Sequence, residues 1–287
     1  MDVSIIIVNF NTRQMTSECI DSIIEKTQGL EFEIILVDNA STDGSKEFFE
    51  KDERITYIYS EKNGGFGYGN NLGMKVAKGK YFFLLNSDTL LINNAVKEFY
   101  DYAEKDDKKR VYGSYLVNQE GLYTCSFNDF PAFTIYSYLK RKIKKKETEP
   151  NIHNIKKVEV VCGADMFFNR YVYEHTGGFD ENIFMYGEDC ELQFRLYKDG
   201  YSSYLINSPR IIHIGKGSST NEIKNTIFKP LLWKSHFYVL KKHMSPLTYI
   251  IARIYYSIII FIRYGITNRV PIKILFKVIT YNANSTN

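Results

Sequence analysis

The first hundred residues alternate short apolar runs with segments of helical character. Val3–Phe10, Phe32–Val37 and Tyr81–Leu85 are nearly unbroken apolar stretches, which is typical of strands buried on both faces. Gln14–Lys26 places its apolar residues on one helical face, and Asn93–Glu104 is a further predicted helix. Strands that alternate with helices form βαβ units, so this pattern predicts an α/β fold with a mixed, mostly parallel sheet flanked by helices.

Acidic or imidazole side chains stand at the ends of several predicted strands. Asp38 ends the second strand, Asp88 follows Tyr81–Leu85, and His213 lies in a short apolar strand near residue 211. Glu188 and Asp189 open a predicted helix. Open α/β sheets bind ligands at the carboxyl ends of their strands. These residues therefore predict a site for a metal and a nucleotide.

Each of these groups also has an ordinary structural interpretation. Asp38 could cap a loop between a strand and a helix, and Asp88 could serve as the N-cap of the helix that follows it. A single histidine on an apolar strand, such as His213, is more often a core residue than a ligand. Glu191 and Arg195, four residues apart, are interpreted as an ion pair on a helix surface.

A glycine-rich loop is predicted over Asn63–Gly69, followed by a helix over Asn70–Lys78. It is no dinucleotide fingerprint, because no glycine follows Gly67 and Gly69 three residues on, and no Walker loop, because Gly-Lys-Ser/Thr is missing. Glycines here would let the backbone approach a ligand closely, but a flexible turn is equally consistent.

The net charge of +4 hides two unlike parts. Residues 1–222, the predicted catalytic domain, hold 27 basic and 33 acidic residues, which argues against a nucleic acid as partner. Residues 223–287 hold ten basic and no acidic residues and are predicted to form a basic amphipathic helical tail on an anionic membrane surface. Ile254–Ile262, the most apolar piece, is too short for a span of about 20 residues.

Two further features bear on location. The four cysteines form no Cys-x-x-Cys pair, which suits a reducing compartment. Met1 is followed directly by a predicted strand, with no basic segment typical of a signal peptide. We therefore expect a cytoplasmic protein, peripheral at the inner face of the cell membrane.

The order and spacing of these motifs over residues 3–220 resemble the family 2 inverting glycosyltransferases. The likeness is strongest to the rhamnosyltransferase-like branch of bacterial cell-surface polysaccharide synthesis. The resemblance implies a glycosyltransferase A-type, Rossmann-like fold, a nucleotide-diphosphate sugar donor, a glycan or polyprenyl-linked acceptor, and Mg²⁺ or Mn²⁺. Asn86 departs from the family pattern, because it replaces the first acid of the Asp-x-Asp element.

The resemblance and the mechanism that it implies assign roles to individual residues. Asp189, with Glu188, matches the catalytic base element. Asp88 and His213 would hold the metal, and Phe179 and Asp180 would lie on the acceptor side. The residues expected to contact the nucleotide sugar are Asn9, Asn11, Asp38, Asn63, Gly64, Gly67, Asn71, Ser87, Asp88, Lys216 and Ser218.

The first donor hypothesis is dTDP-rhamnose, followed by UDP-galactofuranose, UDP-glucose and UDP-galactose. A nucleotidyltransferase is the rival enzyme, but residues 9–13 lack the glycine-rich basic loop that such enzymes usually carry near the N-terminus. A non-catalytic module that binds nucleotide sugars or glycans is the alternative from another class. The presence of both Asp88 and Asp189 argues against it.

Overall fold

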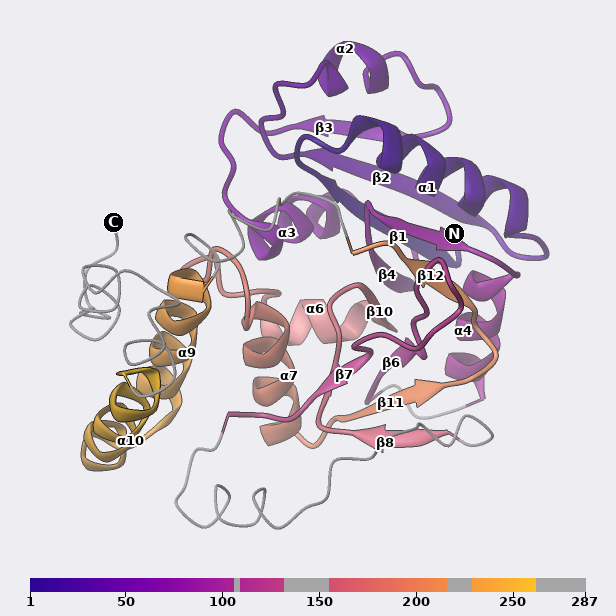
Figure 1. Ribbon diagram of the computed structural model, residues 1–287. Helices are drawn as coiled ribbons and strands as arrows, with labels where there is room; N and C mark the ends of the chain where they lie inside the picture. Colours follow the sequence, from indigo (N-terminus) through magenta and orange to yellow (C-terminus); the bar gives the residue numbers. More distant parts are fainter. Residues whose placement is uncertain (106–108, 132–154, 216–228, 262–287) are drawn as a thin grey trace. The chain divides into compact units, whose positions relative to one another are not determined.

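The computed structural model describes residues 1–105, 109–131, 155–215 and 229–261 (Figure 1). They belong to two compact units. The first holds a large sheet with its helices, and the second holds the segment 182–188 and two C-terminal helices. The charged loop predicted at 140–150 and the tail beyond residue 261 lie outside the described residues.

An eight-stranded sheet forms the centre of the first unit, in the order β3-β2-β1-β4-β10-β6-β11-β8 (Figure 1). Strands β3, β2, β1 and β4 are parallel, as are β6 and β11, whereas β10 runs antiparallel between β4 and β6, and β8 antiparallel to β11. The predicted mixed, mostly parallel α/β sheet is confirmed. The strands are β1 (Val3–Asn9), β2 (Phe32–Asp38), β3 (Thr56–Tyr59), β4 (Tyr81–Asn86), β6 (Arg110–Ser114), β8 (Lys156–Val158), β10 (Asp165–Asn169) and β11 (Ser202–Ile206).

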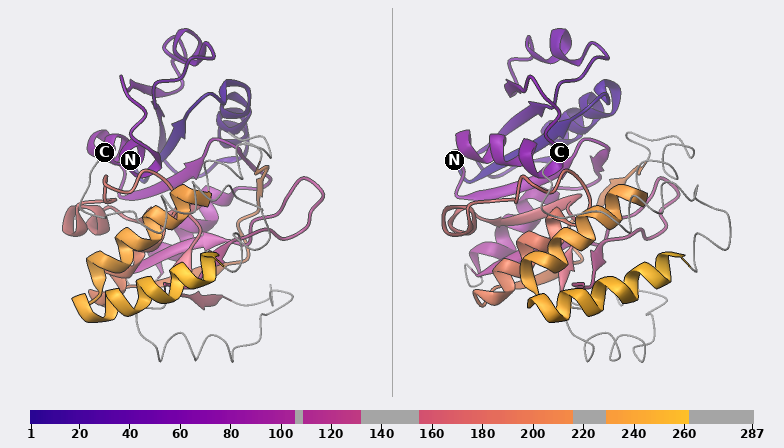
Figure 2. Two further views of the ribbon diagram at one scale, coloured as in Figure 1. Left: turned by 60° about the vertical axis from the view of Figure 1, so that its left-hand side comes forward. Right: turned by 90° about the vertical axis from the view of Figure 1, so that its left-hand side faces the viewer.

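Helices cover both faces of this sheet (Figure 2). Side chains of β1 alternate between two cores: Ile5 and Ile7 pack into one, and Ile6 into the other. The first core includes residues of α1 (Arg13–Lys26), α2 (Ser45–Phe49) and α4 (Ala95–Glu104), and the second those of α3 (Phe66–Val76), α6 (Arg170–Thr176) and α7 (Glu188–Lys198). This two-sided burial explains why the central strands are nearly unbroken apolar runs.

Helix α3 begins at Phe66, four residues before the predicted start, so part of the predicted glycine loop is helical. A Cβ on Gly69 would lie 2.7 Å from Val8 Cγ1, and one on Gly73 would lie 2.5 Å from Ile6 Cγ2. Both distances are shorter than van der Waals contact. These two glycines therefore let α3 pack closely on β1, and packing against the sheet offsets the low helix propensity of glycine.

The strand predicted over Val158–Phe168 is three strands. Strand β8 ends at Val158, β9 (Val160–Val161) pairs with β7 (Phe127–Asn128), and β10 starts after a break around Gly163. At the break between β9 and β10, the Gly163 N–H donates to the Asp189 carboxylate of α7 at 3.2 Å.

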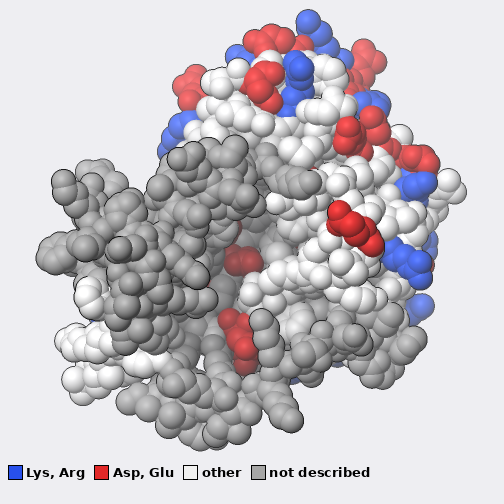
Figure 3. Space-filling model, viewed as in Figure 1, with Lys and Arg blue, Asp and Glu red and all other residues white. Residues whose placement is uncertain are grey.

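Charges of both signs are interspersed on the described part of the face that Figure 3 shows, around α1, α2 and β3.

The second unit contains a helical hairpin, α9 (Lys229–His243) and α10 (Pro246–Ile260), which lie side by side in Figure 2. Ser245 caps α10 through its hydroxyl, which accepts the Thr248 N–H at 3.3 Å, and Pro246 occupies the first turn. Phe237, Leu240 and Ile260 form the buried core of the hairpin. Within the described ranges, each helix is too short or too polar to cross a membrane.

Candidate active site

Asp88 and His213 meet beyond the carboxyl end of β4. Strand β5 (Thr89–Leu91) follows β4 after a two-residue turn and pairs with β12 (Ile211–His213), which places Thr89 opposite His213. The Nε2 atom of His213 lies 3.3 Å from Oδ1 of Asp88, and the Asp88 carbonyl accepts the Ile214 N–H at 2.9 Å. The pairing of two three-residue strands thus joins the two predicted metal ligands.

The electrostatics of His213 are set by its neighbours. Burial lowers the pKa of His213, but the hydrogen bond and charge of Asp88 and the charge of Asp165 together outweigh burial and raise that pKa above its ordinary value. The amide nitrogen of Asn86 also lies 3.5 Å from His213 Nε2. The imidazole therefore retains its proton to a higher pH than a free histidine does.

The Asp88–His213 pair fits two adjacent ligands of one divalent cation. Adjacent donor atoms around an octahedral cation at about 2.1 Å from each ligand are about 3.0 Å apart. The observed 3.3 Å separation is close to that value. Among the described residues, no group of three or more His, Cys, Asp and Glu side chains forms a metal site. Further ligands would have to come from a substrate, as is usual for Mg²⁺ bound with phosphates.

Asp189 lies in the first turn of α7 and faces the loop between β9 and β10. Its Oδ2 atom accepts the Gly163 N–H at 3.2 Å, and its Oδ1 atom accepts the Cys190 N–H at 2.7 Å. Burial raises the pKa of Asp189, and these two backbone hydrogen bonds lower it only in part. A carboxylate with a raised pKa is a stronger proton acceptor, which suits a general base.

The loop between β9 and β10 connects Asp189 with the residues near Asp88. Gly163 binds Asp189, and the carbonyl of the next residue, Ala164, accepts the Asn86 N–H at 3.0 Å. Asn86 is the last residue of β4, two positions before Asp88. Because β10 runs antiparallel to β4, its first residues meet the last residues of β4. Both predicted acidic groups therefore border one edge of the sheet.

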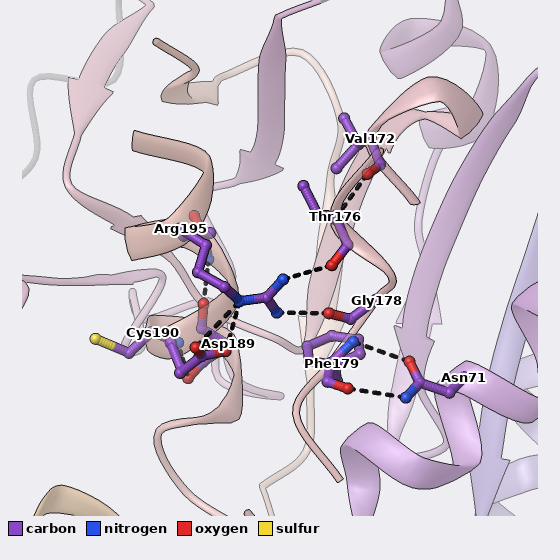
Figure 4. A network of polar contacts seen from close by, with 10 residues as sticks. Asn71, Val172, Thr176, Gly178, Phe179, Asp189, Cys190 and Arg195 are labelled. Carbon is purple, nitrogen blue, oxygen red and sulfur yellow. Dashed lines mark hydrogen bonds and ion pairs between the residues drawn. The ribbon is translucent and has the colours of Figure 1, made fainter. Parts of the chain in front are cut away.

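The loop that follows α6 is fastened by side chains from two helices (Figure 4). Asn71 of α3 accepts the Phe179 N–H and donates to the Phe179 carbonyl, each at 2.9 Å. Arg195 of α7 donates to the carbonyls of Thr176 at 2.7 Å and Gly178 at 2.5 Å. This amide and guanidinium therefore position the segment expected on the acceptor side.

The interpretation of Glu191 and Arg195 as a surface pair is wrong. Glu191 is fully buried, and the Arg195 Nε donates to both of its carboxylate oxygens at 3.0 Å. The pair is buried because this side of α7 faces the loop whose carbonyls Arg195 also binds.

We expect Arg195→Ala to lower the free energy of unfolding by about 3 kcal/mol, because it leaves the Glu191 carboxylate buried without its cation. Urea unfolding followed by circular dichroism measures this change. Lys97→Ala is the matched control, since Lys97 forms a partly exposed pair with Asp101 at the same spacing, and a loss below about 1 kcal/mol is expected there. Equal small losses for both variants would contradict a structural role for Arg195.

Two predicted nucleotide contacts tie neighbouring loops together. Oδ1 of the buried Asn9 accepts the Thr12 hydroxyl at 2.8 Å, and its Nδ2 donates to Ser41 Oγ at 3.1 Å. Oδ1 of Asn11 accepts the Thr42 N–H at 2.7 Å. These bonds fix the loop after β1 to the loop after β2, so Asn9 and Asn11 shape the edge of the sheet. A nucleotide contact for either stays a prediction.

Asp38 caps the loop after β2, as its structural interpretation expects. Its Oδ1 accepts the Ser41 N–H at 2.9 Å, and its Oδ2 accepts the Tyr57 hydroxyl at 3.0 Å. Burial, reinforced by Asp38, raises the pKa of Tyr57. Asn63 similarly accepts the Gly65 N–H at 3.0 Å, in the turn that leads into α3. A nucleotide role for Asp38 and Asn63 stays a prediction.

The other predicted nucleotide contacts are less fully defined. A Cβ on Gly64 would lie 2.3 Å from Cδ1 of the Tyr68 ring, so no larger residue fits there without a shift of that ring. Gly67 is buried in the first turn of α3. Ser87 lies in the turn between β4 and β5. Lys216 and Ser218 lie outside the described residues.

The predicted acceptor residues differ in burial. The Phe179 ring is only 4% exposed and packs edge-on against Phe66, with ring centres 6.1 Å apart, whereas Asp180 is half-buried. Glu188, the second predicted catalytic acid, is buried at the start of α7. Asp180 is thus more accessible to an acceptor than Phe179, whose ring contributes to the core.

Asp165 is a buried acid that the sequence interpretation missed. Its Oδ2 accepts the Ser114 N–H at 2.7 Å and the Ser114 hydroxyl at 2.5 Å, whereas Oδ1 has no hydrogen-bond partner among the described residues. Burial raises the pKa of Asp165 to about 7, against the opposing effects of Ser114 and the charge of His213. The available signal was an acid inside the otherwise apolar stretch Val160–Phe168.

Residues 4–177 match the family described as glycosyl transferase family 2. The chain belongs to this family. The matched region is more than half of the chain and includes Asp38 and Asp88, whereas Asp189 and His213 lie beyond it. The match confirms the family that the motifs indicate.

Two curated relatives show the extent of the similarity. Glycosyltransferase GlyG of Streptococcus pneumoniae is 33% identical over 122 residues, which cover 41% of this chain and 40% of GlyG. The low-salt glycan biosynthesis hexosyltransferase Agl10 of Haloferax volcanii is 28% identical over 203 residues, which cover 69% of this chain and 62% of Agl10. The chain therefore matches less than two thirds of the length of either relative.

A solved structure has a similar fold. The crystal structure of GalNAc-T7 with UDP, GalNAc and Mn²⁺ matches 84% of this chain and 48% of that chain, with a TM-score of 0.61. The sequences are 16% identical, so this likeness concerns the fold alone. The chain thus has the glycosyltransferase A-like α/β fold that the resemblance implies.

Proposed function

We propose that the protein transfers a sugar from a nucleotide-diphosphate sugar to a hydroxyl group of a glycan or lipid-linked acceptor, with inversion at the anomeric carbon. The observation that carries this proposal is the pair Asp88–His213 at the same sheet edge as the loop that binds Asp189. A single displacement needs two functions, removal of a proton and stabilisation of an anionic leaving group. The two groups suit these functions.

Asp189 is the proposed general base. Its carboxylate takes the proton from the acceptor hydroxyl as the acceptor oxygen forms a bond to the anomeric carbon. The bond from that carbon to the diphosphate breaks, and its electron pair leaves with the nucleoside diphosphate. The Gly163 N–H holds the Asp189 carboxylate in position. Glu188, which directly precedes Asp189 in α7, is the second candidate for the base.

Asp88 and His213 are the residues that would hold Mg²⁺ or Mn²⁺. Such a cation, when bound, neutralises charge on the diphosphate. The 3.3 Å separation of the two donor atoms supports this assignment, and the Mn²⁺ in the GalNAc-T7 structure supports the use of a divalent cation. Asn86 is neutral where the family pattern has an acid, so this metal site would have one carboxylate fewer than the family pattern provides.

For the donor, we propose dTDP-rhamnose first and the UDP-hexoses, UDP-galactofuranose included, second. The hexosyltransferase name of Agl10 and the UDP in the GalNAc-T7 structure support including UDP-hexoses. The proposed place of reaction is the inner face of the cell membrane, where lipid-linked acceptors of cell-surface polysaccharide synthesis would lie. The basic residues of 223–287 support this location.

A thermal-shift screen of these nucleotide sugars with Mn²⁺ identifies the donor. Release of nucleoside diphosphate, followed with and without a glycan acceptor, then measures hydrolysis and transfer. Stabilisation by a donor together with its turnover is the expected result. Stabilisation without any turnover would favour the alternative, a non-catalytic protein that binds nucleotide sugars or glycans.

We expect Asp88→Asn to weaken donor binding in Mn²⁺ at least about tenfold, because it removes the only carboxylate of the proposed pair. Titration calorimetry with and without Mn²⁺ measures the effect, and binding without the metal should change little. Asp101→Asn, at a partly exposed carboxylate of α4, is the control. An unchanged dependence on Mn²⁺ in Asp88→Asn would remove Asp88 from the proposed metal site.

A further inference from the structure

Large apolar side chains line the outer face of α10. At 100° per residue, six of them fall within an arc of about 100°. Each is between 44% and 71% exposed, and they are Leu247, Ile250, Ile251, Ile254, Ile258 and Phe261. An apolar stripe of this width is what a surface helix normally turns toward a core.

The opposite face of α10 already supplies the core of the hairpin. Ile260 is buried there with Phe237 of α9, and Tyr249 and Tyr256 pack against the same cluster. The Arg253 guanidinium lies 4.8 Å from the centre of the Phe237 ring and donates to the Tyr249 hydroxyl at 2.6 Å. Helix α10 is therefore apolar on two faces, and the hairpin uses only one of them.

The C-terminal segment of the sequence carries charge of one sign. Residues 223–287 contain ten Lys and Arg and no Asp or Glu, and Lys241 and Lys242 lie in the last turn of α9. A basic segment is attracted to anionic lipid, by about 1 kcal/mol for each Lys or Arg near the surface. A second copy of the chain would bring an equally basic segment against the first, which is repulsive.

We infer that the outer face of α10 inserts into the interface of an anionic membrane, with the helix lying parallel to the surface. The apolar stripe supplies the inserted area, and the basic residues supply attraction to the lipid headgroups. Over the 15 residues that the structure describes, α10 is shorter than the roughly 20 that a span needs, which agrees with this orientation. The inference is independent of the chemistry of transfer.

Sedimentation of the full chain with vesicles tests this surface. The wild type should bind phosphatidylcholine vesicles that contain phosphatidylglycerol, and bind weakly without that anionic lipid. The double variant Ile254→Gln/Ile258→Gln should bind the anionic vesicles at least about tenfold less, because two inserted side chains become polar. Leu122→Gln is the matched control, since Leu122 is 65% exposed in the first unit, and it should bind like the wild type.

Unchanged binding by the double variant would overturn the inference. The inference would also be overturned if the wild type does not bind vesicles but forms dimers, and the double variant does not form them. A second copy of the chain would then cover the stripe. Circular dichroism of the variants checks that they fold, which their exposed positions favour. Turnover of donor with a water-soluble acceptor should not change, so failure here is distinguishable from failure of the proposed reaction.

A second measurement tests the same face of α10 without making it polar. Trp233 is the only tryptophan, so Ile254→Trp in a Trp233→Phe chain places a single reporter on the outer face. Its fluorescence should shift to the blue with anionic vesicles and be quenched by brominated lipid. A spectrum that vesicles leave unchanged would place this face outside the membrane.

Discussion

The Asp189→Asn variant is expected to transfer sugar about 10²- to 10⁴-fold more slowly than the wild type, which is the usual contribution of a general base. The amide cannot take the proton of the acceptor hydroxyl. Its oxygen can still accept the Gly163 N–H, so the loop between β9 and β10 should keep its position. Donor binding should therefore stay within about twofold of the wild type. Transfer rates and donor titration measure the two quantities separately.

Two further variants, one in α7 and one just beyond it, test whether the loss of rate is specific to Asp189. Asp199→Asn changes an exposed carboxylate just beyond the last turn of α7 and should leave the rate unchanged. Glu188→Gln changes the neighbouring acid and should lower the rate less than Asp189→Asn does. The reverse order would assign the base to Glu188. Full activity in both single variants would move the base to another part of the chain.

The strands and most helices of the first hundred residues could be predicted because their signals are local. Phe32–Asp38 is an apolar run, interrupted only by Glu33, that ends in a polar residue, and the strand has those bounds. The meeting of Asp88 with His213 was predictable only as two groups at one sheet edge. Their contact depends on β5 and β12, which at three residues each are too short to produce a periodic pattern.

The features that could not be predicted depend on partners distant in sequence. Gly69 indicates a loop locally, but its close packing on Val8 accompanies its place inside helix α3. Asn71 carries no local signal for its bonds to Phe179, which lies more than one hundred residues later. In each case a tertiary contact determines the structure, and one sequence does not reveal such contacts.

The pH dependence of stability is a large effect expected from Asp165. Its pKa is raised to about 7 by burial, whereas an aspartate in an unfolded chain titrates near 4. Between these values the folded chain keeps a proton that the unfolded chain has lost. Because the folded state then binds more protons, stability falls as pH rises. The gap corresponds to about 4 kcal/mol over the whole interval, and about 3 kcal/mol of it lies between about pH 5 and pH 8.

The Asp165→Asn variant should remove this contribution. Its amide oxygen can accept the hydrogen bonds of Ser114 that now go to Oδ2, and the amide does not titrate. Other titrating groups, His213 included, are present in both chains, so most of their effect cancels in the difference. Relative to the wild type, the variant should therefore gain about 3 kcal/mol of stability between about pH 5 and pH 8.

Urea unfolding of both chains at the two pH values measures this gain, provided that each transition is two-state. Asp199→Asn is the control, because it makes the same substitution at an exposed position. Parallel pH profiles for the wild type and Asp165→Asn would mean that Asp165 is ionised in the folded chain. A charged Asp165 would then need a cationic partner inside the sheet, and the imidazolium of His213, whose charge already acts on Asp165, is the group that could supply it.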